Sequence, residues 1–266
     1  MNLNSWQVHR ALVQEGRERE MTEPHPLEMR VRDCDLPTAV KEHLIRCIHE
    51  GKRHRWHQEL EENFDQVVTS TNTIVDSACR NTGRDRDTLL RDTDFDPNDL
   101  DPDRLDAAIG ELRGINHLRN EGFDRIRLLR AQRGTRTADL VAERNGQKYA
   151  LDVACSSAGA ARGVDALAGY MLGVCRLKEK QLNNTKEVAG CRYRGLVFVV
   201  NSEPALSFGY QLLYRRAARQ VYEALGVPAD YFVAVMTGQI AFVAGGEADS
   251  FEGPDDVVYP EWPIEE

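Results

Sequence analysis

The spacing of apolar residues divides the chain into a helical first part and a later part in which helices and strands alternate. From residue 38 to about residue 78 the apolar positions recur at helical spacing, which predicts a small helical subdomain. After residue 103 the runs shorten and alternate in type. The expected elements there are a helix over 103–121, β-patterned runs at 124–130, 137–144 and 147–155, a helix over 163–184, a strand at 195–201, a helix over 205–225 and two last apolar runs at 231–237 and 239–245. This order predicts an α/β fold with a mixed central sheet, an αβββαβ core and flanking helices.

Charge and proline mark the boundaries between these parts. Residues 1–91 are expected to form a mostly helical N-terminal segment, with little order before residue 35 because that stretch is mixed and polar. Residues 92–102 are rich in aspartate and contain prolines that interrupt regular structure, so they are interpreted as an acidic linker. The α/β domain then covers 103–245, and 246–266 is expected to be an acidic surface tail.

Composition limits the class of protein. Hydrophobic residues make up 41% of the chain and charged residues 29%, and no apolar run approaches the ~20 residues of a membrane span. The first twenty residues have no secretory pattern, and the six cysteines form no CxxC pair, so a cytoplasmic protein with free thiols is expected. The net charge of −9 argues against capture of nucleic acid by the whole surface, but leaves room for a local basic groove.

The segment ADLVAERNGQKYALDVAC carries the main chemical signal. Asn145-Gly146 between two β-patterned runs predicts a two-residue hairpin, whose register places Val141 opposite Ala150 and Asp139 opposite Asp152. Two carboxylates in such a position repel one another. Three explanations stay open: a bridging divalent cation, a carboxylate that remains protonated, or a slipped register.

Two helices supply further candidate groups. Glu111 lies at the edge of the apolar stripe of the first helix, where it either faces the sheet or pairs with a surface cation such as Arg104. Lys178 and Gln181 fall within the apolar stripe of the second helix. A lysine there either meets anions from the hairpin or extends its ammonium past the helix edge to water.

Together these residues resemble the PD-(D/E)XK nuclease superfamily, the fold of restriction endonucleases. The resemblance covers residues 103–201 and implies metal-dependent hydrolysis of phosphodiester bonds, DNA more than RNA, with Mg²⁺ or Mn²⁺ as cofactor. It implies that Glu111, Asp139, Asp152 and the carbonyl of Val153 bind the metal. The chain departs from the family pattern at Ala154, where the motif has a lysine; by resemblance to members with a KxxQ pattern on the following helix, Lys178 and Gln181 take its place.

Other signals bear on partners. Lys52, Arg53, Arg55 and Trp56 have the composition of a nucleic-acid-binding patch with a stacking ring, or of an ordinary solvated helix face. His43, Cys47 and His49 lack a fourth zinc ligand at a suitable spacing. The expected partner is nucleic acid without a membrane, and the resemblance adds a homodimer. The alternative function is a catalytically silent nuclease-like scaffold that binds nucleic acid or a protein.

Overall fold

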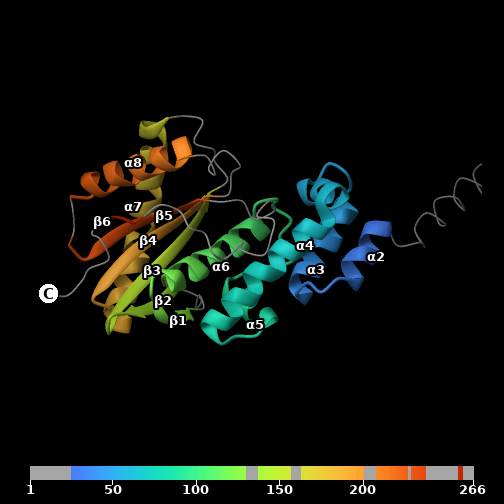
Figure 1. The fold of residues 1–266 in the computed structure, drawn as a ribbon, viewed down its shortest axis with the longest axis horizontal. Coiled ribbons are helices and arrows are strands. Elements are labelled where there is room, and N and C mark those ends of the chain that lie inside the picture. The colour runs from blue at the N-terminus through green and yellow to red at the C-terminus, as the bar shows by residue number, and fades with distance from the viewer. Residues whose placement is uncertain are drawn as a thin grey trace, which may run out of the picture.

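The computed structural model describes residues 25–129, 137–156, 163–200, 208–226, 229–237 and 257–259. Within them the chain forms a mixed α/β fold, as the sequence predicts (Figure 1). The helices are α2 (Pro26–Asp33), α3 (Thr38–Glu50), α4 (Arg55–Thr82), α5 (Arg86–Asp92), α6 (Arg104–Asn120), α7 (Val164–Ala189) and α8 (Phe208–Ala224). The strands are β1 (Asp124–Leu128), β2 (Leu140–Arg144), β3 (Gln147–Ser156), β4 (Tyr193–Val200), β5 (Tyr231–Thr237) and β6 (Val257–Tyr259).

The N-terminal helices α2 to α5 lie beside the sheet domain, with α2 and α3 at one end of the molecule and α5 near β1 (Figure 1). Helix α2 falls in a stretch for which the sequence predicted little order. It is only eight residues long, too short for a clear periodic pattern, but Leu27 and Val31 are buried in the core. Among the described residues, no helix combines the length and apolar character needed to cross a membrane.

The strands lie in the order β1-β2-β3-β4-β5-β6. The pairs β3–β4 and β4–β5 are parallel, and the other neighbouring pairs are antiparallel. The predicted hairpin is confirmed: Val141 pairs with Ala150, and both turn residues, Asn145 and Gly146, have the positive φ of a type I′ turn. The register slip is thereby eliminated.

The last strand comes from the predicted acidic tail. Residues 257–259 pair antiparallel with β5, because Val257, Val258 and Tyr259 form a short β-prone run within the acidic stretch. The prediction of a tail without a strand is wrong here, because it relied on the acidic composition of 246–266. The strand expected at 239–245 lies outside the described residues.

Each face of the sheet has its own apolar core. On one face, α6 packs on β3 and β4, and the same continuous core includes the buried residues of α2 to α5. On the other face, α7 and α8 cover β3, β4 and β5. The residues predicted as a linker contribute Phe95, which is 6% exposed, to the first core. The first helix of the sheet domain is therefore held between the sheet and α4.

Candidate active site

The two hairpin aspartates meet as the sequence predicted. Asp139 immediately precedes β2, and the pairing of Leu140 with Leu151 continues to place it opposite Asp152. The backbone N–H of Val153 donates to Asp139 Oδ2 at 2.8 Å, which fixes the orientation of that carboxylate. The side chain of Asp152 is 0% exposed. A buried carboxylate needs partners that compensate for its lost hydration.

Helix α7 supplies those partners. Lys178 Nζ lies 2.7 Å from Asp152 Oδ1 and 4.0 Å from Asp139 Oδ1. Gln181, one turn further along the same face, donates from Nε2 to Asp152 Oδ2. Lys178 therefore meets the hairpin anions, as predicted, and both Asp152 oxygens have a partner on α7.

Glu111 lies on α6, which packs on the sheet face opposite to α7, and it reaches a cavity next to Asp139. It lines this cavity, of about 190 Å³, together with Asp139, Val153 and Lys178. Helix α6 comes close to β3 because residue 114 is glycine: a Cβ there would lie 2.9 Å from Val153 Cγ1. The absence of that side chain helps place Glu111 beside the hairpin.

The electrostatics reflect this crowding of anions. Burial raises the pKa of Glu111 well above its usual range, and the charges of Asp139 and Asp152 raise it further. Burial and Asp152 likewise raise the pKa of Asp139. Burial disfavours the charged form of Lys178, but Asp139 and Asp152 together raise its pKa above the ordinary value. Lys178 stays a cation among three carboxylates, so the cluster carries excess negative charge when all three ionise.

This donor set has the chemistry that Mg²⁺ or Mn²⁺ prefers, namely carboxylate oxygens with room for water. The uncompensated negative charge at the cavity also fits a divalent cation. Within the parts of the chain that the structure describes, however, no three Asp, Glu, His or Cys side chains are already close enough together to hold an ion. Glu111 and Asp139 line the cavity and Asp152 is buried next to Lys178, so the three carboxylates do not form a closed set of ligands.

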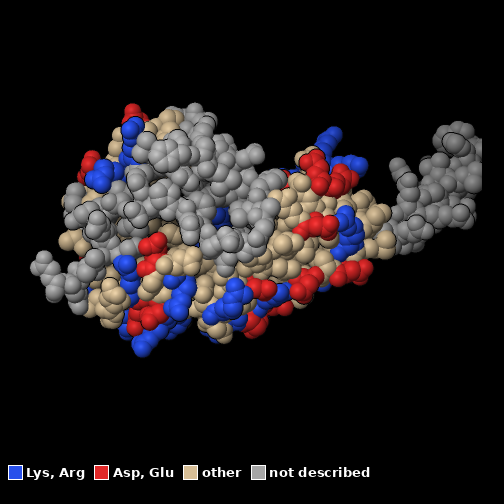
Figure 2. Space-filling view, in the orientation of Figure 1, with Lys and Arg blue, Asp and Glu red and all other residues tan. Residues whose placement is uncertain are grey.

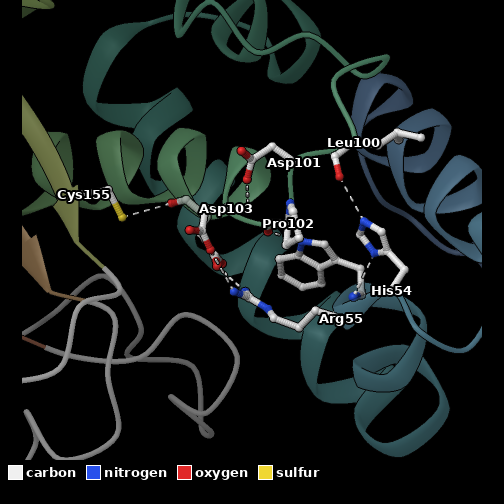
Figure 3. Close-up of polar contacts among 9 residues, drawn as sticks. His54, Arg55, Leu100, Asp101, Pro102, Asp103 and Cys155 are labelled. Atoms are coloured by element: carbon white, nitrogen blue, oxygen red, sulfur yellow. Dashed lines mark hydrogen bonds and ion pairs between the residues drawn. The ribbon is translucent and has the colours of Figure 1, made fainter.

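The predicted nucleic-acid patch has a different role in the structure (Figure 3). Trp56 is 2% exposed and donates from Nε1 to the carbonyl of Pro102 at 3.1 Å, so the prediction that its ring stacks on a base is wrong. Arg55 pairs with Asp103 and Asp106 at the start of α6. The apolar ring is buried because α4 packs on α6, a contact the local sequence could not reveal.

The remaining two residues of that patch are exposed. Lys52 Nζ lies 3.3 Å from Glu61 Oε1, and Arg53 is exposed to solvent. Figure 2 shows Lys and Arg interspersed with Asp and Glu over the surface of the N-terminal helices. Neither residue lines the cavity of Glu111 and Asp139.

The sequence reading missed one wall of the cavity. Thr93 and Phe95, within the predicted linker 92–102, line it, together with Arg104 from the predicted helix over 103–121. Arg104 does not pair with Glu111; its Nη2 donates to the carbonyl of Asp94 and its Nε lies 3.5 Å from Asp99. The one available signal was Phe95, a large apolar residue within an otherwise acidic run.

No family model, curated protein or solved structure matches this chain.

Proposed function

We propose that the protein is a metal-dependent nuclease that hydrolyses phosphodiester bonds, in DNA more readily than in RNA. The observation that carries the proposal is the contact of Lys178 with both hairpin aspartates beside a cavity that Glu111 also lines. Glu111 and Asp139 are half-buried carboxylates with raised pKa values, next to a cation in a cavity, and such groups are typical of catalytic sites. The resemblance to PD-(D/E)XK nucleases names a reaction that uses these groups.

Each residue has a separate role in this proposal. Glu111, Asp139, Asp152 and the carbonyl of Val153 would hold Mg²⁺ or Mn²⁺, which supplies Lewis-acid polarisation of a phosphate oxygen and a more acidic bound water. Lys178 donates to the attacking water or to the developing negative charge on phosphate. Gln181 orients Asp152 through its amide. The proposed partner is DNA and the proposed location is the cytoplasm, in line with six free thiols among the described residues.

A second candidate is a catalytically silent scaffold that binds nucleic acid or a protein. Two observations favour it: Ala154 stands where the family motif has lysine, and Asp152 already has a partner on each oxygen. In a scaffold these contacts would serve only to stabilise the buried aspartate.

The test is titration calorimetry with Mn²⁺, followed by a plasmid-nicking assay on the same samples. We compare the parent with Asp139→Asn, and use Asp33→Asn as the matched control, because Asp33 is exposed on α2. The proposal expects binding and nicking by the parent and by the control, and loss of both in Asp139→Asn. DNA binding by the parent without metal binding or nicking would favour the scaffold.

A further inference from the structure

One face of α6 links the candidate catalytic groups to a separate cation that lines the same cavity. Arg104, Ala107, Ala108 and Glu111 all line that cavity. Arg104 and Glu111 are seven residues apart, which places them on the same helix face at a separation of roughly 10.5 Å along the axis. The two alanines between them are small and leave the space open.

The guanidinium of Arg104 makes two contacts with the protein, which leaves some of its N–H donors available to a ligand. Its Nη2 donates to the Asp94 carbonyl oxygen at 2.8 Å. Its Nε lies 3.5 Å from Asp99 Oδ2, in a pair whose side chains are 38% and 45% exposed. Such an exposed pair contributes little, and Arg has five N–H donors in a planar fork suited to phosphate.

Thr93 and Phe95 form another wall of the cavity, and contacts with neighbouring residues hold both in place. Phe95 is 6% exposed and makes an edge contact with the His43 ring, with centroids 5.3 Å apart. Thr93 donates from Oγ1 to the Leu90 carbonyl at 2.7 Å. Arg104 therefore faces a cavity whose other side is anchored to the N-terminal helices.

Lys178 lines the cavity beside the carboxylates of Glu111 and Asp139, whereas Arg104 supplies a separate cation seven residues before Glu111 on α6. The cavity volume of about 190 Å³ corresponds to roughly six water molecules, enough for a phosphate group with bound water. A strand whose scissile phosphate lies near Glu111 would bring a neighbouring phosphate towards Arg104. We infer that Arg104 is a second phosphate-binding position, which holds a phosphate flanking the bond to be cut; this rests on the proposed nuclease function.

The test measures binding without cleavage. Fluorescence anisotropy with labelled single-stranded DNA in a metal chelator compares the parent with Arg104→Gln. Arg219→Gln is the matched control, because Arg219 is exposed on α8 and does not line this cavity. Loss of one charge-assisted contact predicts about tenfold weaker binding in Arg104→Gln alone. It also predicts that the slope of log affinity against log salt becomes shallower by about 0.7 in that variant.

Two further measurements separate recognition from structure. Arg104→Lys keeps the charge but loses the fork, so its affinity should lie between those of the parent and Arg104→Gln. Scanning the DNA with single uncharged methylphosphonate linkages should find one position at which the parent and Arg104→Gln bind equally. Equal affinity and salt slope in the parent and Arg104→Gln would overturn the inference.

The failure of this inference is distinct from failure of the proposed function. A parent that nicks DNA and binds it no better than Arg104→Gln leaves the nuclease and removes the second phosphate position. A parent that needs Arg104 for binding but never nicks removes the nuclease and leaves Arg104 as a phosphate contact of the scaffold, without a role beside a cleaved bond. A parent that binds no DNA in the chelator and does not nick plasmid with Mn²⁺ contradicts both.

Discussion

Lys178 Nζ and Asp152 Oδ1 lie 2.7 Å apart, which joins helix α7 to the fully buried carboxylate on strand β3. Removing one partner of such a pair leaves an uncompensated buried charge, and this is usually more costly than removing both. The same contact can therefore be tested for its structural role separately from catalysis.

Replacement of Lys178 by methionine should lower the free energy of unfolding by about 3 kcal/mol, because the buried Asp152 carboxylate loses the ammonium that lies 2.7 Å from its Oδ1. The double variant Asp152→Asn/Lys178→Met should lose less than the sum of the two single variants. Urea denaturation of the four proteins measures this coupling. Additivity within about 0.5 kcal/mol would show that the two side chains are energetically independent.

The stability of the metal-free protein should fall as pH rises from the ordinary carboxyl range through the raised pKa values of Glu111 and Asp139. A raised pKa means that the folded state binds more protons than the unfolded state over that interval, so folding is favoured at its lower end. Asp139→Asn removes one of these groups. Its melting temperature should exceed that of the parent at neutral pH, with the gap closing near pH 4.

Thermal unfolding in a chelator at several pH values tests this prediction. Asp33 is an exposed aspartate on α2, so the melting temperature of Asp33→Asn should equal that of the parent at neutral pH. A difference in melting temperature between the parent and Asp139→Asn that stays constant across pH would contradict the prediction that burial and carboxylate repulsion raise the pKa of Asp139.

Trp56→Ala should destabilise the protein by about 3–5 kcal/mol, since the ring is buried and its N–H is bonded to Pro102. Under conditions where it remains folded, its affinity for DNA should equal that of the parent. Denaturant unfolding and anisotropy measure the two effects. A tenfold loss of DNA affinity in the folded variant would restore the stacking role that burial argues against.

Gly114→Ala should destabilise the protein by about 1–3 kcal/mol, because the added methyl group would meet Val153 Cγ1 at 2.9 Å and push α6 from β3. Glu111 lies one turn earlier on α6, so metal-dependent nicking should fall with it. The matched control is Gly169→Ala on α7, where a Cβ meets nothing within 4 Å. That variant should be neutral or stabilised by up to about 1 kcal/mol.

The sequence alone determined the features set by local rules. Asn145-Gly146 fixed the hairpin turn, and the strand period of two then fixed which residues face each other, so the proximity of Asp139 and Asp152 followed from the chain itself. The helical period placed Lys178 and Gln181 one turn apart on a single face of α7, and the structure brings both to Asp152.

Tertiary packing decided what lies around these elements. Trp56 and Arg55 have the composition of a binding patch, but the packing of α4 on α6 buries the first and pairs the second. Residues 92–102 read as a linker by charge, but Phe95 anchors them in the core and Arg104 follows at the cavity wall. Local periodicity reports which side of an element is apolar, whereas the contacts between elements depend on packing across long sequence separations.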